Sequence, residues 1–337
     1  MAHVGELPEG IDTMPNTSFD LHDLEIRADR ANFVTWEGRE ALRLENGLAL
    51  VDGPGLTDAR VEVLVGTEGP AYPGVAFRVA DVLNHELAYA VPHVSGQWDA
   101  LQYDPVFHGS NTWQLYHGSG YQREAQVPTG RWFRLELDFC GDRAAIAVDG
   151  QPPLTVSQLA RSTPTGAIGL WTFRPAYFSD LHVAVYQGEP VPSAEPSCPP
   201  PGCVETWFLE GFGVVACEPS GVLNLNRYLP LSAKGARLFR RFETSKAQEV
   251  ALEFGFSDQL SLELDGSVVY RGENTFRGFE DRAARGYAEL STGSHRETVP
   301  AGKHTLAAYL EVSEGFGWGM VLAARGEGLH WLPPEPG

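Results

Sequence analysis

The sequence of 337 residues has little of several features that define large classes of protein. Its 4 cysteines are too few for a chain held together by disulfides. Lysine and arginine number 25 against 44 aspartates and glutamates, and the net charge of −19 argues against a nucleic-acid partner, which needs a clustered basic face. No apolar run approaches the roughly 18 residues of a membrane span, so no membrane partner is expected either.

The N-terminal segment MAHVGELPEGIDTMPN lacks the basic, apolar and small-residue regions of a signal peptide. A cytoplasmic location is therefore expected. Cys140 lies in a predicted strand and is expected to stay reduced. The other three cysteines are Cys198, Cys203 and Cys217. They have no histidine nearby, and the 4 residues between the first two make a poor zinc pattern. A disulfide among these three would require an exported protein.

Familiar catalytic motifs are missing as well. The sequence has no E-x-D-x-x-E strand of laminarinase-like glucanases, no G-x-S-x-G, no H-E-x-x-H and no phosphate loop. A retaining glycosidase needs two carboxylates about 5 Å apart, and an inverting one needs about 6.5 to 9.5 Å. Asp99 and Asp104 are available, but a sequence does not give their separation. No established catalytic pair is therefore assigned.

The sequence also has no motif for binding a cofactor, so we expect that no cofactor is required. The carboxylates are spread along the chain rather than run together. This distribution indicates mainly a solvated, self-repelling surface, with calcium binding at its edges as the alternative. No metal ligands are assigned.

What the sequence does contain is many short segments in which apolar and polar residues alternate. This period of two is typical of half-buried β-strands, whereas no long segment has the 3.6-residue period of a helix. Asp149-Gly150 and Asp265-Gly266 are pairs that favour tight hairpin turns. The clearest strands are ARVEVLVG (59–66), WFRLELDF (132–139), EVALEFGF (249–256), LSLEL (260–264) and HTLAAYLEVS (304–313).

A proline-rich segment, QGEPVPSAEPSCPPPG, interrupts the strand pattern. Prolines cannot donate to a sheet and favour a stiff, extended linker. The sequence therefore predicts an all-β protein of two consecutive antiparallel sandwiches. The first domain is expected at 1–186, the linker at 187–204, and a second, smaller sandwich at 205–332.

Two segments of the first half predict a shallow trough on a sheet. In GVAFRVAD, Val75, Phe77 and Val79 can face the core, which leaves Arg78 on the other face with small residues. The next strand adds further alanines to that face. An arginine in such a trough offers planar donors to a hydroxyl or carboxylate; the alternative is an ordinary surface arginine.

The segment that follows is dense in aromatic residues with polar neighbours. Aromatic rings stack on the apolar faces of sugars, and Asp, Asn, Gln, His and Arg side chains bond to sugar hydroxyls. The alternative is a structural loop whose rings cover the edge of the sandwich. The candidate binding residues here, besides Arg78, are Trp98, Gln102, Tyr103, His108, Trp113, Gln114 and Tyr116, with Asp99 and His93 as catalytic candidates if the protein is an enzyme.

The same segment carries a family resemblance. YPGVAFR, YAVPHVSGQWDALQYDPVFHGSNTWQLYHGSGY, WFRLELDFCGDRAAIAVDG and AYFSDLHV occur in the order typical of a bacterial concanavalin A-like (laminin G-type) family. That family is related to the domain assigned to 3-keto-disaccharide hydrolases. The resemblance covers residues 60–183 and implies a concanavalin-like jelly roll. His108 stands where the family has asparagine and Val94 where it has glutamine, so a role at these two positions is not implied.

The second half resembles galactose-binding-like jelly rolls, which are usually accessory domains. The matching segments are FGFSDQLSLELDGSVVYRGENTF and AGKHTLAAYLEVSEGFGWGM. The resemblance points to loop-end candidates at Asp258, Asn274 and Arg277. Asp265 is also a candidate, but its pairing with glycine indicates a hairpin turn, and Trp318 among glycines indicates a core ring.

Three functions remain open at this point. The favoured one is a non-catalytic glycan-binding protein with its main site on the first sandwich. The second is a carbohydrate-active hydrolase or lyase that uses Asp99 with His93 and Arg78. The third is a structural or interaction protein that buries its aromatic residues at a subunit interface, including that of a homo-oligomer.

Overall fold

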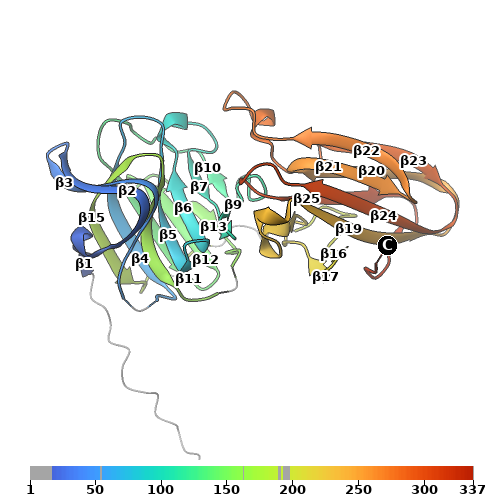
Figure 1. The fold of residues 1–337 in the computed structure, drawn as a ribbon, viewed down its shortest axis with the longest axis horizontal. Coiled ribbons are helices and arrows are strands. Elements are labelled where there is room, and N and C mark those ends of the chain that lie inside the picture. Colours follow the sequence, from blue (N-terminus) through green and yellow to red (C-terminus); the bar gives the residue numbers. More distant parts are fainter. Residues whose placement is uncertain (1–16, 54, 162, 189–190, 193–197, 337) are drawn as a thin grey trace, which may run out of the picture.

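The computed structural model describes residues 17–53, 55–161, 163–188, 191–192 and 198–336 (Figure 1). The N-terminal segment 1–16 and part of the predicted linker, 189–190 and 193–197, lie outside the described residues. Within them the protein is all-β, as predicted. Its helical turns are 3-10 turns of 3 residues each: η1 (Leu21–Asp23), η2 (Pro92–Val94), η3 (Leu225–Arg227), η4 (Leu231–Ala233) and η5 (Ala283–Arg285).

Strands β1 to β15 form the first sandwich, which is drawn in blue to green in Figure 1. They are β1 (Thr17–Phe19), β2 (Glu25–Trp36), β3 (Arg39–Leu50), β4 (Ala59–Gly66), β5 (Tyr72–Asp81), β6 (Asn84–Ala90), β7 (Leu101–Tyr103), β8 (Val106–Phe107), β9 (Ser110–Asn111), β10 (Gln122–Arg123), β11 (Phe133–Cys140), β12 (Arg143–Val148), β13 (Leu154–Val156), β14 (Ala167–Phe173) and β15 (Ala176–Val185).

The long strand β3 joins the two layers of this sandwich. One end of β3 pairs with β14, at the head of the layer β10-β7-β6-β5-β14. The other end pairs with β15, at the head of the layer β15-β4-β11-β12-β13. Because the two neighbours share one edge of β3, the sheet divides there and its layers can fold over a common core.

Strands β16 to β26 form the second sandwich, drawn in yellow to red. One sheet has the order β17-β16-β19-β24-β21-β22, with β26 also on β19, and the other has the order β18-β25-β20-β23. The strands are β16 (Thr206–Leu209), β17 (Gly213–Ala216), β18 (Leu223–Asn224), β19 (Gly235–Thr244), β20 (Gln248–Phe256), β21 (Asp258–Leu264), β22 (Ser267–Asn274), β23 (Gly293–Val299), β24 (Gly302–Glu311), β25 (Gly319–Arg325) and β26 (His330–Trp331).

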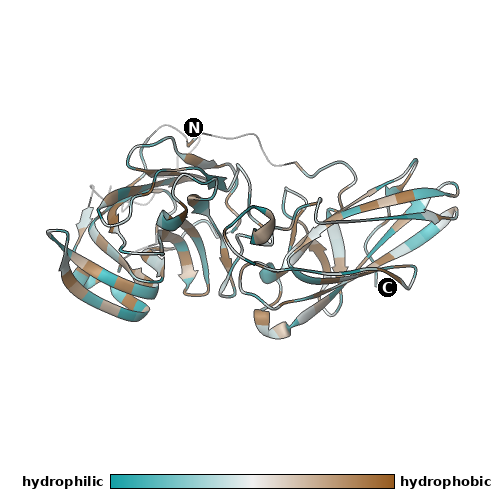
Figure 2. Ribbon diagram, turned by 90° about the horizontal axis from the view of Figure 1, so that it is seen from above, coloured by the Kyte–Doolittle hydropathy of each residue, from teal (hydrophilic) through white to brown (hydrophobic). Residues whose placement is uncertain are grey.

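The predicted alternation is confirmed in both sandwiches, and Figure 2 shows teal and brown residues alternating along many strands. In β11, for example, Phe133, Leu135 and Leu137 are fully buried while the residues between them reach solvent. The predicted hairpin at Asp265-Gly266 joins β21 to β22, and both residues have the positive φ angles, 49° and 79°, of a type I′ turn. All 4 cysteines are free thiols.

The two sandwiches pack against each other through what we call the inter-sandwich interface. The backbone of Gln114 bonds both to the carbonyl of Phe316 (3.0 Å) and to the amide of Ala288 (3.0 Å). Gln122 donates to the hydroxyl of Tyr287 at 2.8 Å. Ala288, Val321 and Ala323 of the second sandwich belong to the same buried hydrophobic cluster as the core of the first. The apolar interior is therefore continuous across this interface.

Candidate functional site

A cavity of about 190 Å³ lies at the inter-sandwich interface. We call it the interface pocket. Its lining is largely aromatic and comes from both sandwiches, which is a common setting for ligand sites. The lining residues are Tyr72, Tyr89, Asp99, Gln102, Asn111, Trp113, Trp171 and Phe173 of the first sandwich, and Phe276, Phe279, Arg285 and Phe316 of the second.

The first sandwich supplies the floor of the pocket through strand register. Gln102 of β7 pairs with Tyr89 of β6, which pairs with Gly74 of β5, which pairs with Trp171 of β14. Residues paired across strands point to the same face, so these side chains form one row. Gly74 adds no side chain to the row, which lets the rings of Tyr89 and Trp171 approach to 5.7 Å between centroids. Tyr72 and Phe173 form the next pair along.

The second sandwich supplies the facing wall through two loops. The loop between β22 and β23 carries Phe276 and Phe279, and the loop between β24 and β25 carries Phe316. Trp113 of the first sandwich meets Phe276 edge-on at 5.8 Å and Phe316 at 5.4 Å between ring centroids. Neither sandwich alone encloses the cavity, so the pocket depends on their docking.

A buried ion pair crosses the interface beside the pocket. Arg285 donates through Nε to Oδ2 of Asp99 at 2.9 Å, and its Nη2 lies 2.8 Å from the same oxygen. Their side chains are only 1% and 3% exposed. The guanidinium also donates to the carbonyl of Gly278 and lies over the rings of Phe279 and Trp98. Burial raises the pKa of the Asp99 carboxyl, an effect that the charge of Arg285 partly offsets.

Two polar residues of the pocket lining have unused bonding capacity. Oδ1 of Asp99 is buried and has no hydrogen-bond partner within the described residues. Asn111 donates to Asp104 at 2.8 Å, which leaves its amide oxygen as a further acceptor. The Tyr89 hydroxyl donates to the amide oxygen of Gln102 at 3.2 Å, so these two groups are already bonded to each other. Acceptor oxygens among aromatic faces suit a ligand that has donor hydroxyls and apolar ring faces.

Of the residues that the sequence singled out, Asp99, Gln102 and Trp113 line the pocket. His93 lies at its border, edge-on to Tyr72 (4.9 Å) and Phe279 (5.2 Å) between centroids. Burial lowers the pKa of this histidine. The structure therefore brings part of the predicted set of site residues together at one cavity.

Arg78 lies elsewhere, and the predicted trough around it is wrong. A β-bulge in β5, where Ala76 pairs with Gly169 but Val79 with Ala167, breaks the alternation at this residue. Arg78 has a φ of 48° and is only 3% exposed. Its guanidinium donates to the backbone carbonyls of Thr57 and Gly141. It holds two loops together and does not reach the pocket.

Tyr103 is adjacent to Gln102 in β7 and therefore points to the opposite face of the sheet. Its ring is fully buried, and its hydroxyl donates to Glu86 (2.7 Å) and accepts from the amide of Ala160 (2.6 Å). Its sequence-derived place in a sugar site is not supported by this position. The structure makes it a core residue with a satisfied hydroxyl.

Three further candidates of the first sandwich bond to the second sandwich instead of lining the pocket. His108 contacts the carbonyl of Asn226 through Nδ1 at 2.7 Å. Gln114 donates to the carbonyl of Arg285 at 3.0 Å. Tyr116 accepts from Asn224 at 3.4 Å. Trp98 packs beneath Arg285 and borders a separate surface hollow.

The candidates of the second sandwich also have local structural roles. Asp258 accepts from the amides of Ser313 and Glu314, and burial raises its pKa to about 6. Asn274 donates to two backbone carbonyls, and Arg277 donates to the carbonyl of Ala283. Trp318 is a fully buried core ring, as its glycine-rich setting indicated.

Sequence reasoning missed most of the aromatic lining, including Trp171, Phe173 and Phe316, because these residues are distant from one another along the chain. It also missed Arg285. The signal that could have found the facing wall is the segment 276–287, FRGFEDRAARGY, whose aromatic and arginine residues follow a strand without continuing its alternation.

No group of three or more His, Cys, Asp and Glu side chains within the described residues is placed to hold a metal ion. Among the helices in the same residues, none is long and apolar enough to cross a membrane.

Comparisons with known proteins give only distant similarity. No family model matches the sequence, and no curated protein matches it significantly. The structure is similar to the carbohydrate-binding module CBM66 from Bacillus subtilis, with 16% identity, 46% of this chain and 92% of that chain covered, and a TM-score of 0.36. It is also similar to the exoplasmic/lumenal domain of VIP36 in its Ca²⁺- and Man3GlcNAc-bound form, with 10% identity, coverage of 48% and 85%, and a TM-score of 0.35.

A third similarity is to the GH43 protein BlXynB from Bacillus licheniformis, with 9% identity, 43% of this chain and 33% of that chain covered, and a TM-score of 0.31. These similarities assign neither a ligand nor an activity to the chain, since one fold hosts many functions. The resemblance to relatives of 3-keto-disaccharide hydrolases stays a prediction.

Proposed function

We propose that the protein binds carbohydrate and that the interface pocket holds one sugar residue. The observation that carries the proposal is the buried, unpartnered Oδ1 of Asp99 beside a ring of aromatic side chains. A buried acceptor without a partner is costly to leave unpaired, and a ligand hydroxyl would satisfy it. The aromatic faces would stack on the apolar face of the same sugar ring.

The size of the pocket supports recognition of a single ring. Its volume of about 190 Å³ is below the roughly 300 to 1,000 Å³ of sites for drug-sized ligands. The wall from Phe276, Phe279 and Phe316 closes the side away from the first sandwich. A pocket of this kind favours the end of a glycan, because an internal residue would need room for chain on both sides.

A binding role is favoured over glycoside hydrolysis by the number of carboxylates. Among the described residues that line the pocket, Asp99 is the only carboxylic acid, and it is held by Arg285. Hydrolysis by two carboxylates needs a second one within about 10 Å on the other side of the bond. Arg78, the third residue of the enzyme hypothesis, bonds to Thr57 and Gly141 instead.

The test uses two substitutions in the full chain. Trp113→Ala removes a ring from the pocket and is expected to raise the Kd for a bound monosaccharide or glycoside by about 5- to 150-fold, if stacking on a sugar matches stacking on a nucleic-acid base. Trp132→Ala is the matched control, because Trp132 packs on Trp36 outside the pocket. Isothermal titration against a panel of glycosides measures both variants. Equal affinity of Trp113→Ala and wild type for every bound sugar would remove the pocket from the binding site.

Asp99→Asn separates binding from catalysis. If the asparagine oxygen keeps the bond to Arg285, its amide group replaces the free acceptor Oδ1 with a donor. For a binding protein we expect affinity to fall by about 1.5 to 3 kcal/mol, the range of a hydrogen bond to a charged group. In an enzyme, ligand would still bind while product formation fell by at least about 10²-fold. Turnover by the wild type that Asp99→Asn abolishes would replace the binding proposal with the enzyme hypothesis.

A further inference from the structure

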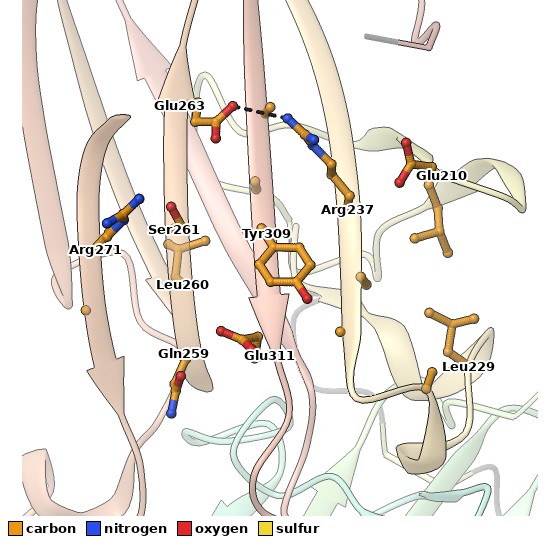
Figure 3. A pocket seen from close by; sticks show the side chains of 17 residues that line it. Glu210, Leu229, Arg237, Gln259, Leu260, Ser261, Glu263, Arg271, Tyr309 and Glu311 are labelled. Atoms are coloured by element: carbon orange, nitrogen blue, oxygen red, sulfur yellow. Dashed lines mark hydrogen bonds and ion pairs between the residues drawn. The ribbon is translucent and has the colours of Figure 1, made fainter. Parts of the chain in front are cut away.

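A second hollow, larger than the interface pocket, lies on the second sandwich. It is a groove of about 770 Å³ on the outer face of the sheet that contains β19, β24, β21 and β22 (Figure 3). We call it the sheet groove. It is lined by Leu209, Glu210, Leu229, Ala233, Gly235, Ala236, Arg237, Gln259, Leu260, Ser261, Glu263, Arg271, Gly272, Ala307, Ala308, Tyr309 and Glu311.

Strand register places the polar side chains of the groove in rows. Arg237 of β19 pairs with Tyr309 of β24, which pairs with Ser261 of β21, which pairs with Arg271 of β22. The row crosses four strands and is therefore about 14 Å long at a spacing of about 4.8 Å between strands. It is flanked by Glu311 and Gln259 on one side and by Glu263 on the other. A tyrosine ring thus lies between two arginines on one face.

Tyr309 lies across the neighbouring strand because that strand has a glycine there. A Cβ atom on Gly235 would come within 2.5 Å of the Tyr309 hydroxyl and 2.9 Å of its ring. Figure 3 shows the ring between β24 and β19 with its hydroxyl toward β19. The residue is 43% exposed although it lies in the middle of the sheet. An aromatic face is therefore held in position and open to solvent.

Several polar side chains around this ring have no hydrogen-bond or ion-pair partner among the described residues. Arg237 bonds to Glu263 at 3.2 Å. Within the described residues, the side chains of Arg271, Gln259 and Glu311 have no hydrogen bond or ion pair. The lining has 2 arginines and 3 glutamates, so the groove carries little net charge and offers both donors and acceptors. That combination does not favour a polyanion or a polycation, whose binding requires an excess of one sign.

We propose that the sheet groove binds a neutral oligosaccharide along its length, as a second site separate from the interface pocket. A sugar stacks on Tyr309, and neighbouring residues of the same chain bond through their hydroxyls to Arg271, Gln259 and Glu311. The groove is open and longer than one sugar ring, so it accepts internal segments of a glycan. This site does not depend on the function of the interface pocket.

A second copy of the protein fits the groove less well. Stable interfaces between subunits have cores depleted of charged residues. The centre of the sheet groove has Arg237, Arg271, Glu263 and Glu311 around a single ring. Burial of these groups against an identical surface would desolvate charges without matching apolar area.

The test is titration of the 337-residue chain with neutral oligosaccharides of three or more residues from glucan, xylan and mannan series. Tyr309→Ala is expected to raise the Kd of the bound series at least 5-fold, and Arg271→Ala to raise it in the same direction. Phe212→Ala is the matched control, because Phe212 is 55% exposed on the same sandwich but outside the groove. Thermal melting of each variant verifies that it is folded.

Trp113→Ala distinguishes the two sites, because it alters the interface pocket and leaves the sheet groove intact. Oligosaccharide binding that survives Trp113→Ala and is weakened by Tyr309→Ala supports the proposal. The proposal is overturned if no neutral oligosaccharide binds the wild type, or if Tyr309→Ala binds as tightly as the control. A wild-type dimer in sedimentation velocity that Tyr309→Ala converts to monomer would show that a second copy occupies the groove, which also overturns it.

Discussion

At the scale of single residues, the Asp99–Arg285 pair places two opposite charges in the buried part of the inter-sandwich interface. Both side chains are almost fully buried, and the arginine donates one hydrogen bond to the carboxylate and makes a second close contact with the same oxygen. The free-energy cost of removing two charges from water is offset only when the geometry of the pair is intact. The pair therefore fixes how the two sandwiches dock more than it adds to stability.

Arg285→Met tests this role. The substitution keeps a long apolar side chain but leaves the Asp99 carboxylate buried without its partner, so we expect the free energy of unfolding to fall by about 3 to 5 kcal/mol. Arg296→Met is the matched control: its pair with Glu249 is 69% and 60% exposed, and its loss should cost at most about 1 kcal/mol. Urea denaturation measures both. Equal losses of unfolding free energy in the two variants would show that the buried pair contributes no more than an exposed one. The double variant Asp99→Asn/Arg285→Met should recover part of the unfolding free energy lost in Arg285→Met.

Asp104 predicts a pH dependence of stability. This fully buried carboxyl accepts from Asn111 and from the amide of Thr112, yet burial raises its pKa to about 7. The folded state then holds a proton that the unfolded state loses near its ordinary pKa of about 3.9. Its contribution to stability is full below that pH, declines as the pH rises toward 7, and is lost above it.

Asp104→Asn removes this titration. The unfolding free energy of the variant should fall less between pH 5 and pH 8 than that of the wild type, measured by urea denaturation at each pH. Asp142→Asn, at an exposed position, controls for the loss of one charge. A slope in Asp104→Asn as steep as in the wild type would show that this carboxyl is already ionised at pH 5 in the folded protein.

At the scale of strands, the sequence predicted which residues are buried better than it predicted the face of the sheet to which each side chain points. The alternation in β11, β20 and β21 was predicted correctly because each strand has one apolar face. In β5 the same reasoning failed, because a β-bulge adds one residue and turns Arg78 away from the expected face. A bulge depends on pairing with the neighbouring strand and has no marker in the strand's own sequence.

The register between neighbouring strands determines which residues line the pocket, and the sequence did not give this register. The sequence placed the alanines of β6 beside the trough, but Ala88 pairs with Val75 and Tyr89 pairs with Gly74. A shift of one residue in pairing exchanges the two faces of a strand. Tyr89 therefore lines the pocket, whereas Tyr103, which pairs with Ala88, enters the core.

At the scale of the whole molecule, the strand content and sequence of two sandwiches were predictable, but the interface between them was not. The predicted division at 187–204 stays a prediction. Three of the 12 lining residues, Asp99, Gln102 and Trp113, were found because they lie close together in sequence. The lining from the second sandwich was missed because it is distant in sequence: Arg285, for example, is 186 residues after Asp99, and these loops reach the pocket only when the sandwiches dock.

The same interface predicts how the chain unfolds. Backbone bonds, the buried ion pair and a shared apolar cluster join the sandwiches. We expect one cooperative thermal transition, with calorimetric and van't Hoff enthalpies that agree, because separation of the two parts would expose all of these groups. Two resolved transitions would show that each sandwich unfolds independently and that the interface contributes little.

The shared walls of the interface pocket make ligand affinity a property of the whole assembly. If only the docked arrangement can hold a sugar, the measured Kd equals the intrinsic Kd divided by the docked fraction. Substitutions at His108, Gln114 or Tyr116, which contact the second sandwich but not the cavity, would then lower affinity without touching the ligand. By the same linkage, a bound sugar would increase the fraction of molecules in which the two sandwiches are docked.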